Sequence, residues 1–157
     1  MSLIPLACFF TGHRVLDDVS GLKKELESAV FRMVENGVTV FICGGALGFD
    51  TLAAQAVLEL RGKYPIKLCL YLPCRDQCNG WEFFDILEYE RIKSASDEVF
   101  YVTEDGKASA AAMKKRNKAM VEASDYCICY LKNDTSGTGQ TARMAEEKGI
   151  EVINLYE

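Results

Sequence analysis

The stretch VTVFICGGALGFDTLAAQAVLELR, residues 38–61, contains the signals of a strand, a glycine-rich turn and a helix in succession. Its first six residues are nearly all apolar, which is typical of a strand covered on both faces of a sheet. Three glycines follow within residues 44–50, and a helical period then runs from Thr51 to Arg61. The stretch therefore predicts one strand-and-helix unit of a parallel sheet.

The same alternation extends outward from this unit in both directions. Apolar runs predict six strands, at residues 7–10, 38–43, 66–72, 98–102, 126–131 and 151–155. Helical periods predict five helices between them, around residues 22–34, 51–61, 82–94, 108–123 and 140–148. Asn36-Gly37 and Gly149 supply stop signals for the first and last helix. The fold class is therefore α/β, a doubly wound parallel sheet with right-handed crossovers, and we expect the strand order 3-2-1-4-5-6.

Length and composition narrow the class of protein. The 157 residues hold no linker or repeat, so we expect a single domain over residues 1–157. No apolar run approaches the roughly 20 residues of a membrane helix, and no secretory signal is visible, so we expect a cytoplasmic protein without a membrane partner. The net charge of −5 makes nucleic acid an unlikely partner, since binding to phosphate backbones needs concentrated Lys and Arg.

The seven cysteines are expected to be reduced thiols, because most lie inside apolar runs of a chain without an export signal. Cys74 and Cys78 lie four residues apart in an expected loop, but no second pair of Cys or His complements them. We therefore expect neither a metal site nor another cofactor.

In an open parallel sheet, ligands bind beyond the carboxyl ends of the strands, so the segments that follow the strands are the candidate site. Gly44, Gly45 and Gly48 follow the second strand and allow close approach of a phosphate or sugar, or else serve only a tight turn. Asp50 either caps the next helix or accepts hydrogen bonds from a ribose.

Two further segments carry polar side chains at the same edge. Thr11-Gly12-His13-Arg14 follows the first strand, where Arg14 can hold a phosphate with two hydrogen bonds and His13 is more simply a structural group than a base. Ser136-Gly137-Thr138 precedes the last helix and offers backbone donors and two hydroxyls, although Ser136 or Thr138 can also cap that helix.

Aromatic and basic side chains complete the candidates. Trp81 and Phe83-Phe84 can stack on a base, although aromatic residues at a helix start more often belong to the core. Arg116 and Asn117 lie on a helix whose apolar face we read as Ala112, Met113, Met120 and Val121. We expect Arg116 to be exposed, as charged residues on helices usually are, because the spacing alone gives no reason to expect otherwise.

Together these residues resemble the DUF1273 family of the SLOG superfamily. The resemblance rests on residues 10–14, residues 44–50, Arg116-Asn117 with Met120, and Ser136-Gly137-Thr138, and it covers nearly the whole chain. It implies a Rossmann-like fold that binds a nucleotide or nucleotide-derived ligand. Relatives include the LOG phosphoribohydrolases and the DNA-processing protein DprA. The resemblance to LOG enzymes also implies that this chain can form a homodimer.

The comparison with LOG enzymes suggests a site without their catalysis. Arg116 matches their helical arginine, but Asn117 stands in place of the following lysine, Thr141 in place of the catalytic glutamate, and residues 133–135 in place of Pro-Gly-Gly. A threonine cannot stabilise an oxocarbenium-like sugar or activate water as a carboxylate does. The resemblance therefore implies a ligand-binding module or sensor with no assigned catalytic residue. The alternatives are a LOG-like hydrolase of nucleoside monophosphates, in which Asp50 or His13 replaces the glutamate, and a DprA-like nucleic-acid-binding protein.

Overall fold

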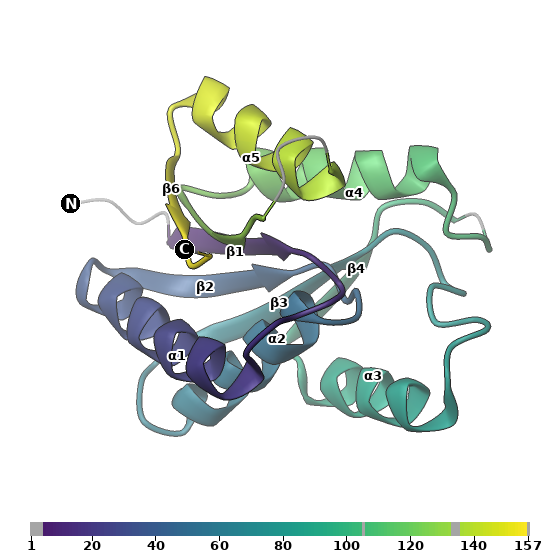
Figure 1. Cartoon of the computed structure of the whole chain (residues 1–157), viewed down its shortest axis with the longest axis horizontal. Coiled ribbons are helices and arrows are strands. Elements are labelled where there is room, and N and C mark those ends of the chain that lie inside the picture. The colour runs from purple at the N-terminus through teal and green to yellow at the C-terminus, as the bar shows by residue number, and fades with distance from the viewer. Residues whose placement is uncertain (1–4, 105, 133–135, 157) are drawn as a thin grey trace.

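The computed structural model describes residues 5–104, 106–132 and 136–156, which form one parallel sheet covered by helices (Figure 1). The elements in chain order are β1 (Leu6–Gly12), α1 (Val19–Glu35), β2 (Val38–Cys43), α2 (Phe49–Arg61), β3 (Lys67–Leu72), α3 (Phe83–Ala95), β4 (Glu98–Tyr101), α4 (Ala110–Glu122), β5 (Tyr126–Tyr130), α5 (Gly137–Lys148) and β6 (Glu151–Asn154). The predicted α/β class is confirmed: these residues give six strands and five helices in a Rossmann-like arrangement.

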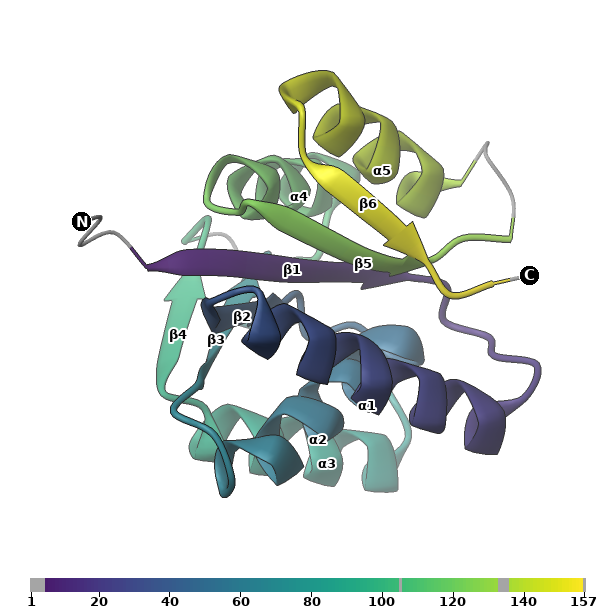
Figure 2. The ribbon, with the colours of Figure 1, turned by 90° about the vertical axis from the view of Figure 1, so that its left-hand side faces the viewer.

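The sheet is covered on both faces, as its apolar strands predict. Helices α1, α2 and α3 pack on one face and α4 and α5 on the other (Figure 2). Successive residues of β1 point to opposite faces, so Phe10 packs in the core under α1–α3 while Phe9 packs in the core under α4–α5. Both rings are fully buried. Burial on both faces is the reason why this strand is apolar at consecutive positions rather than at alternate ones.

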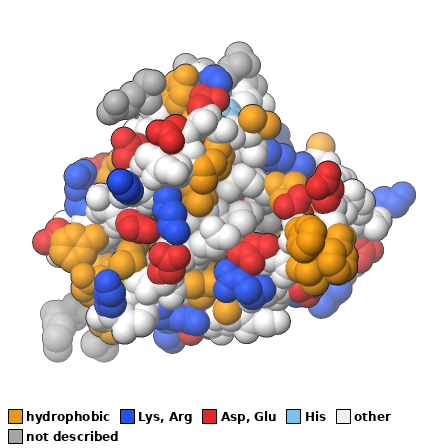
Figure 3. Space-filling view, turned by 60° about the horizontal axis from the view of Figure 1, so that its bottom comes forward, with side chains coloured by type: hydrophobic (Ala, Val, Ile, Leu, Met, Phe, Trp, Pro, Cys, Tyr) orange, Lys and Arg blue, Asp and Glu red, His pale blue; other side chains and the backbone are white. Residues whose placement is uncertain are grey.

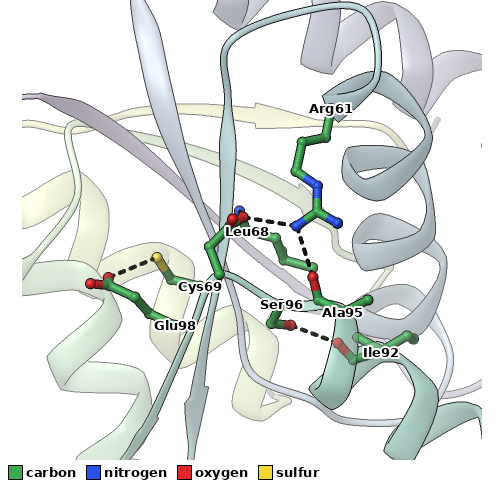
Figure 4. A network of polar contacts seen from close by, with 8 residues as sticks. Arg61, Leu68, Cys69, Ile92, Ala95, Ser96 and Glu98 are labelled. Atoms are coloured by element: carbon green, nitrogen blue, oxygen red, sulfur yellow. Dashed lines mark hydrogen bonds and ion pairs between the residues drawn. The ribbon is translucent and has the colours of Figure 1, made fainter.

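The expected strand order is wrong at one strand. The sheet runs β4-β3-β2-β1-β5-β6, so β4 lies at the edge beside β3 and not between β1 and β5. Asp97, just before β4, explains this placement: its carboxylate accepts hydrogen bonds from the Leu68 backbone N–H of β3 and from Arg61 of α2, both at 2.9 Å. Arg61 also donates to the Ala95 carbonyl at the end of α3, so this network ties the start of β4 to β3 (Figure 4).

The strand order sets where the chain reverses its direction across the sheet. From β1 to β4 the chain moves steadily toward one edge, and α4 then returns it to β5 on the other side of β1. Because the helices change face at this reversal, the topological switch point lies between β1 and β5, where a crevice opens beyond the strand ends.

Helix ends follow the local signals of the sequence. Asp18 caps the start of α1 by accepting a hydrogen bond from the Gly21 N–H at 3.1 Å. After the end of this helix, Gly37 adopts a φ of 94°, as expected for a glycine that stops a helix. Gly149 ends α5 in the left-handed conformation, as predicted. Within residues 5–104, 106–132 and 136–156, no helix has the length and apolar character needed to cross a membrane.

Candidate functional site

A cavity of about 250 Å³ lies at the switch point, and most of the candidate residues line it. We call it the switch-point cavity. Its predicted lining residues are Thr11, Gly12, Arg14, Asp50, Arg116, Asn117, Ser136, Gly137 and Thr138, and His13, Ala46, Met113 and Met120 complete it. Segments after β1 and β2, the start of α5 and one face of α4 therefore meet around one space.

Residues at the end of β1 and directly after it form one wall. Thr11 is buried, whereas Arg14 is exposed at the cavity rim. A Cβ on Gly12 would overlap the Phe49 ring, so a residue without a side chain lets the first turn of α2 pack against β1. Gly12 therefore has a packing role that its ligand-binding interpretation did not include.

His13 has a structural partner. Its Nε2 accepts a hydrogen bond of 2.7 Å from the Lys132 backbone N–H, and its carbonyl accepts one from the Phe49 N–H at 3.1 Å. Because Nε2 is occupied by a backbone donor, this nitrogen is not free to take a proton from a ligand. His13 instead ties the segment after β1 to the segment after β5.

Arg116 is the buried cation of the cavity, with only 4% of its surface exposed. The expectation of an exposed side chain is wrong, because α4 buries Ala112, Arg116 and Met120 at four-residue steps on one face. The guanidinium donates Nη1–H to the Gly44 carbonyl and Nε–H to the Asn117 Oδ1, the latter at 2.7 Å. Among the residues that the structure describes, its Nη2 has a hydrogen-bond contact only with the Met113 sulfur, at 3.9 Å.

Asp50 brings a buried carboxylate to the same cavity, with 5% of its surface exposed. It does not cap α2, since the N-cap position is Gly48, and its Oδ2 instead accepts from the Ala46 N–H at 3.3 Å. Burial raises the pKa of Asp50 to about 6, and the opposing effects of Arg116, of backbone N–H groups and of Arg14 only partly offset it.

Gly44, Gly45 and Gly48 do not line the cavity. Gly45 and Gly48 adopt φ of 74° and 80°, so the turn itself requires glycine there. Gly44 is different: a Cβ on it would lie 2.7 Å from the Arg116 Cζ and 3.0 Å from the Asp50 Oδ2. Because Gly44 has no side chain, the Arg116 guanidinium and the Asp50 carboxylate can both lie close to its backbone.

The start of α5 forms the remaining wall. Ser136 is the N-cap and accepts from the Gly139 N–H at 3.1 Å, which settles the capping alternative in its favour over Thr138. Residues at the start of a helix present unpaired N–H groups and a partial positive charge to the cavity. Thr141 is buried and donates its hydroxyl to the Gly137 carbonyl at 2.9 Å. Residues 133–135, expected at the position of the LOG Pro-Gly-Gly, lie outside the described residues.

The aromatic candidates do not line the cavity. Trp81 packs edge-to-face on Tyr89, with ring centroids 5.4 Å apart. Phe83 and Phe84 are 67% and 80% exposed, which contradicts their expected place in the core, and they contribute to the apolar surface over α3 (Figure 3).

Gln77 is a buried polar residue that the sequence analysis missed. Its Nε2 donates to the Gly44 carbonyl at 3.2 Å, so this carbonyl accepts from both Gln77 and Arg116. The Tyr89 hydroxyl donates to the Gln77 Oε1, also at 3.2 Å. The sequence did contain one indication that Gln77 belongs near the site, because it lies in the segment that follows the carboxyl end of β3.

Comparison with known proteins identifies close sequence relatives. A family model described as the YspA SLOG family matches residues 8–153. The UPF0398 proteins of Bacillus thuringiensis (strain Al Hakam) and Bacillus cereus (strain Q1) are each 30% identical over 139 residues, which span 88% of this chain and 76% of theirs.

Two solved structures share the fold at lower identity. DNA processing protein A from Helicobacter pylori, described for its unique single-stranded DNA binding mode, superposes with a TM-score of 0.69 at 22% identity. DNA processing protein A from Streptococcus pneumoniae gives a TM-score of 0.70 at 21% identity. The match covers 95% of this chain but only 64% and 49% of those longer chains, so the likeness concerns the fold of one part of each.

Proposed function

Because this chain belongs to the YspA SLOG family, we propose that it binds a phosphate-bearing nucleotide or nucleotide derivative in the switch-point cavity. The family match confirms the resemblance to the SLOG superfamily that the sequence motifs indicate. The ligand and its site are our inference from the geometry of the cavity.

The observation that carries this proposal is the buried guanidinium of Arg116. Among the described residues, no carboxylate oxygen lies within ion-pair distance of it, and Nη2 contacts only a thioether. A buried cation is costly unless it is paired and fully hydrogen-bonded. A phosphate oxygen in the cavity would supply both the charge and the missing acceptor.

Other groups of the cavity favour the same kind of ligand. Arg14 adds a second positive charge at the rim, and with Asp50 ionised these three side chains carry a net charge of about +1. The Gly137 and Thr138 N–H groups at the start of α5 add donors that suit an anion. In this arrangement Thr11, Gly12, Asn117 and Ser136 complete the wall, and the buried Asp50 is placed to accept hydrogen bonds from ribose hydroxyls. Gly44 supports the wall through its carbonyl, which accepts from Arg116, whereas Gly45, Gly48 and Trp81 do not line the cavity.

A ligand screen by thermal unfolding tests the proposal. Nucleoside 5′-monophosphates at ~100 times their dissociation constant are expected to stabilise the protein by ~2.7 kcal/mol, a shift of several degrees. Arg116→Ala should weaken binding by at least ~1.4 kcal/mol, about tenfold, because charged hydrogen bonds contribute about 1.5–3 kcal/mol.

Arg14→Ala serves where the buried substitution prevents folding, since Arg14 is exposed. Arg32→Ala is the matched control: Arg32 is also exposed but lies in the last turn of α1 and does not line the cavity. Nucleotides that leave the unfolding temperature unchanged, or an equal loss of binding in Arg14→Ala and Arg32→Ala, would remove the cavity as the site.

Hydrolysis of a nucleoside monophosphate is a second candidate, favoured by the raised pKa of Asp50 inside the cavity. A LOG-type reaction is disfavoured, because Thr141 stands at the position of the catalytic glutamate and its hydroxyl already donates to the Gly137 carbonyl. The Nε2 of His13 already accepts a hydrogen bond from the Lys132 backbone N–H, which makes His13 a weaker candidate for the base than Asp50. Release of free base that disappears in Asp50→Asn would establish the enzyme, and no release with intact binding would leave a binding module.

Single-stranded nucleic acid is the other candidate, because the fold matches a protein described for its single-stranded DNA binding mode. That neighbour weighs against the expectation, from a net charge of −5, that nucleic acid is not a partner. Retention of oligonucleotides that weakens steeply with added salt would favour this candidate over a small nucleotide.

A further inference from the structure

We infer that two buried residues outside the cavity, Gln77 and Tyr89, position the Arg116 guanidinium so that it can bind a phosphate. They act through the Gly44 carbonyl, which accepts hydrogen bonds from both Gln77 and Arg116. Neither Gln77 nor Tyr89 lines the switch-point cavity. The inference rests on the function proposed above and identifies the residues that orient its main binding group.

Two hydrogen bonds fix the plane of the guanidinium. Its Nε–H donates to the Asn117 Oδ1, and its Nη1–H donates to the Gly44 carbonyl. Because the group is planar and rigid, holding these two nitrogens also sets the direction of Nη2. Among the described residues, Nη2 meets only the Met113 sulfur, so it is the nitrogen that a phosphate oxygen would approach. The direction of Nη2 therefore depends on where the Gly44 carbonyl points.

Gln77 restrains that carbonyl. A carbonyl oxygen has two lone pairs, and here Arg116 uses one while the Gln77 Nε2 uses the other, at 3.2 Å. The peptide bond in question joins Gly44 to Gly45, and glycine restricts the backbone less than any other residue does. Hydrogen bonds rather than steric contacts must therefore hold the orientation of this peptide. Without the amide, the carbonyl is free to rotate and to carry Nη1 with it.

Tyr89 determines which end of the Gln77 amide faces the carbonyl. Its hydroxyl donates to the Gln77 Oε1 at 3.2 Å, which leaves Nε2 as the group that meets Gly44. The opposite orientation of the amide would place two oxygen atoms against each other. Tyr89 is itself held in place, because it is only 6% exposed and Trp81 packs edge-to-face against its ring.

The two adjacent glycines make room for the two parts of this network. A Cβ on Gly44 would collide with the Arg116 guanidinium. A Cβ on Gly45 would instead lie 3.0 Å from the Gln77 Oε1 and 2.5 Å from the Leu72 Cδ2. Gly44 thus accommodates the group that binds the phosphate, and Gly45 accommodates the residue that restrains the carbonyl.

Calorimetric titration of the full chain with AMP and with adenosine, at constant ionic strength, tests this inference. The ratio of the two affinities measures what the phosphate contributes. Adenosine is measured by displacement of AMP, and GMP with guanosine repeats the comparison. Gln77→Met keeps the approximate volume of the side chain but removes the amide. It should lower AMP affinity about fivefold, as expected for one lost hydrogen bond, and leave adenosine affinity unchanged.

Two more substitutions act on the same network. Gln77→Glu replaces the amide donor with a carboxylate that competes with the phosphate for Arg116, so it should lower AMP affinity by at least about tenfold. Tyr89→Phe keeps the ring and should lower AMP affinity about twofold. Gln55→Met is the matched control, because the Gln55 amide donates to Glu88 at 2.6 Å and does not line the cavity. It should leave both affinities unchanged.

Thermal unfolding of each variant ensures that only folded protein is titrated. If Gln77→Met does not fold, Tyr89→Phe decides the question, since it removes a single oxygen atom. An equal loss of AMP and adenosine affinity, or lower stability with an unchanged ratio, would show that Gln77 and Tyr89 only support the fold. That result overturns this inference while the proposed function stands. Failure of every nucleotide to bind the unsubstituted protein overturns both.

Discussion

Gly44→Ala should displace the Arg116 guanidinium without straining the backbone. The added Cβ would lie 2.7 Å from the Arg116 Cζ and 3.0 Å from the Asp50 Oδ2, closer than van der Waals contact allows. Gly44 is not among the described glycines with positive φ, so alanine is compatible with its backbone conformation. The effect of this substitution therefore reports on the space that Arg116 and Asp50 share.

The expected magnitude follows from the contact that is lost. Displacing the guanidinium removes its hydrogen bond to the Gly44 carbonyl, a charged interaction that contributes about 1.5–3 kcal/mol. Replacing Gly by Ala returns about 0.4–1 kcal/mol by restricting the unfolded chain. The net loss is roughly 1–2 kcal/mol, which lowers the unfolding midpoint by roughly 2–8 °C in a chain of this length.

Denaturant unfolding with a matched control measures this loss. Gly62→Ala is the control, because Gly62 has a φ of −69° and its added Cβ would approach nothing closer than the Glu59 carbonyl oxygen at 3.8 Å. It should be neutral or stabilise by about 0.4–1 kcal/mol. Phosphate-ligand affinity should fall about tenfold in Gly44→Ala and stay constant in Gly62→Ala.

A double-mutant cycle gives the result that would refute the reasoning. If Gly44→Ala acts through the guanidinium, its cost should largely disappear in an Arg116→Gln background, where the side chain is shorter and uncharged. Additive costs of the two substitutions would show that Gly44 matters for a reason unrelated to Arg116.

Three further predictions concern Asp50, Tyr89 and Lys148. The folded-state pKa of Asp50, about 6, lies above its ordinary value of 3.8, so its contribution to stability is complete below about pH 4 and is lost as the pH rises through 6. Across that window the unfolding free energy of the wild type should fall relative to Asp50→Asn by up to roughly 3 kcal/mol, and parallel pH profiles would contradict the raised pKa. Tyr89→Phe removes the hydroxyl that donates to the Gln77 Oε1 and should lower the free energy of unfolding by about 1 kcal/mol, measured by thermal unfolding. Tyr64→Phe is the control and should lower it less, because this ring is partly exposed and its hydroxyl has no hydrogen bond among the described residues. Lys148→Met should cost about 1 kcal/mol, because its ammonium donates to the Val121 and Glu122 carbonyls at the end of α4, and nucleotide affinity should not change.

Much of the candidate site could be placed from the sequence because strand ends are local signals. Thr11 and Ser136 each follow an apolar run, and in a parallel sheet such positions share one edge. The structure brings both to the switch-point cavity. The sequence could not decide which polar groups line the cavity and which only contact those that do.

Gly44 and Gln77 illustrate the difference. The glycine cluster indicated a ligand-binding turn, but Gly44 contributes a carbonyl that receives the Arg116 guanidinium from 72 residues further along the chain. Gln77 donates to the same carbonyl from 33 residues away, and no local pattern marks it. The helical period of α4 did contain the signal for a buried Arg116, since it continues the four-residue steps of Ala112 and Met120, but a charged residue is normally assigned to the exposed face.

The sequence by itself determined the alternation of strands and helices, their approximate limits and the edge of the sheet at which the candidate site residues gather. Apolar periodicity carries that information, because it reflects burial of residues that are neighbours along the chain. Only the tertiary structure decided that β4 lies beside β3 and that one carbonyl serves both Gln77 and Arg116. These features depend on contacts such as that of Asp97 with Leu68 and Arg61, between residues that the chain brings together only when the whole sheet has formed.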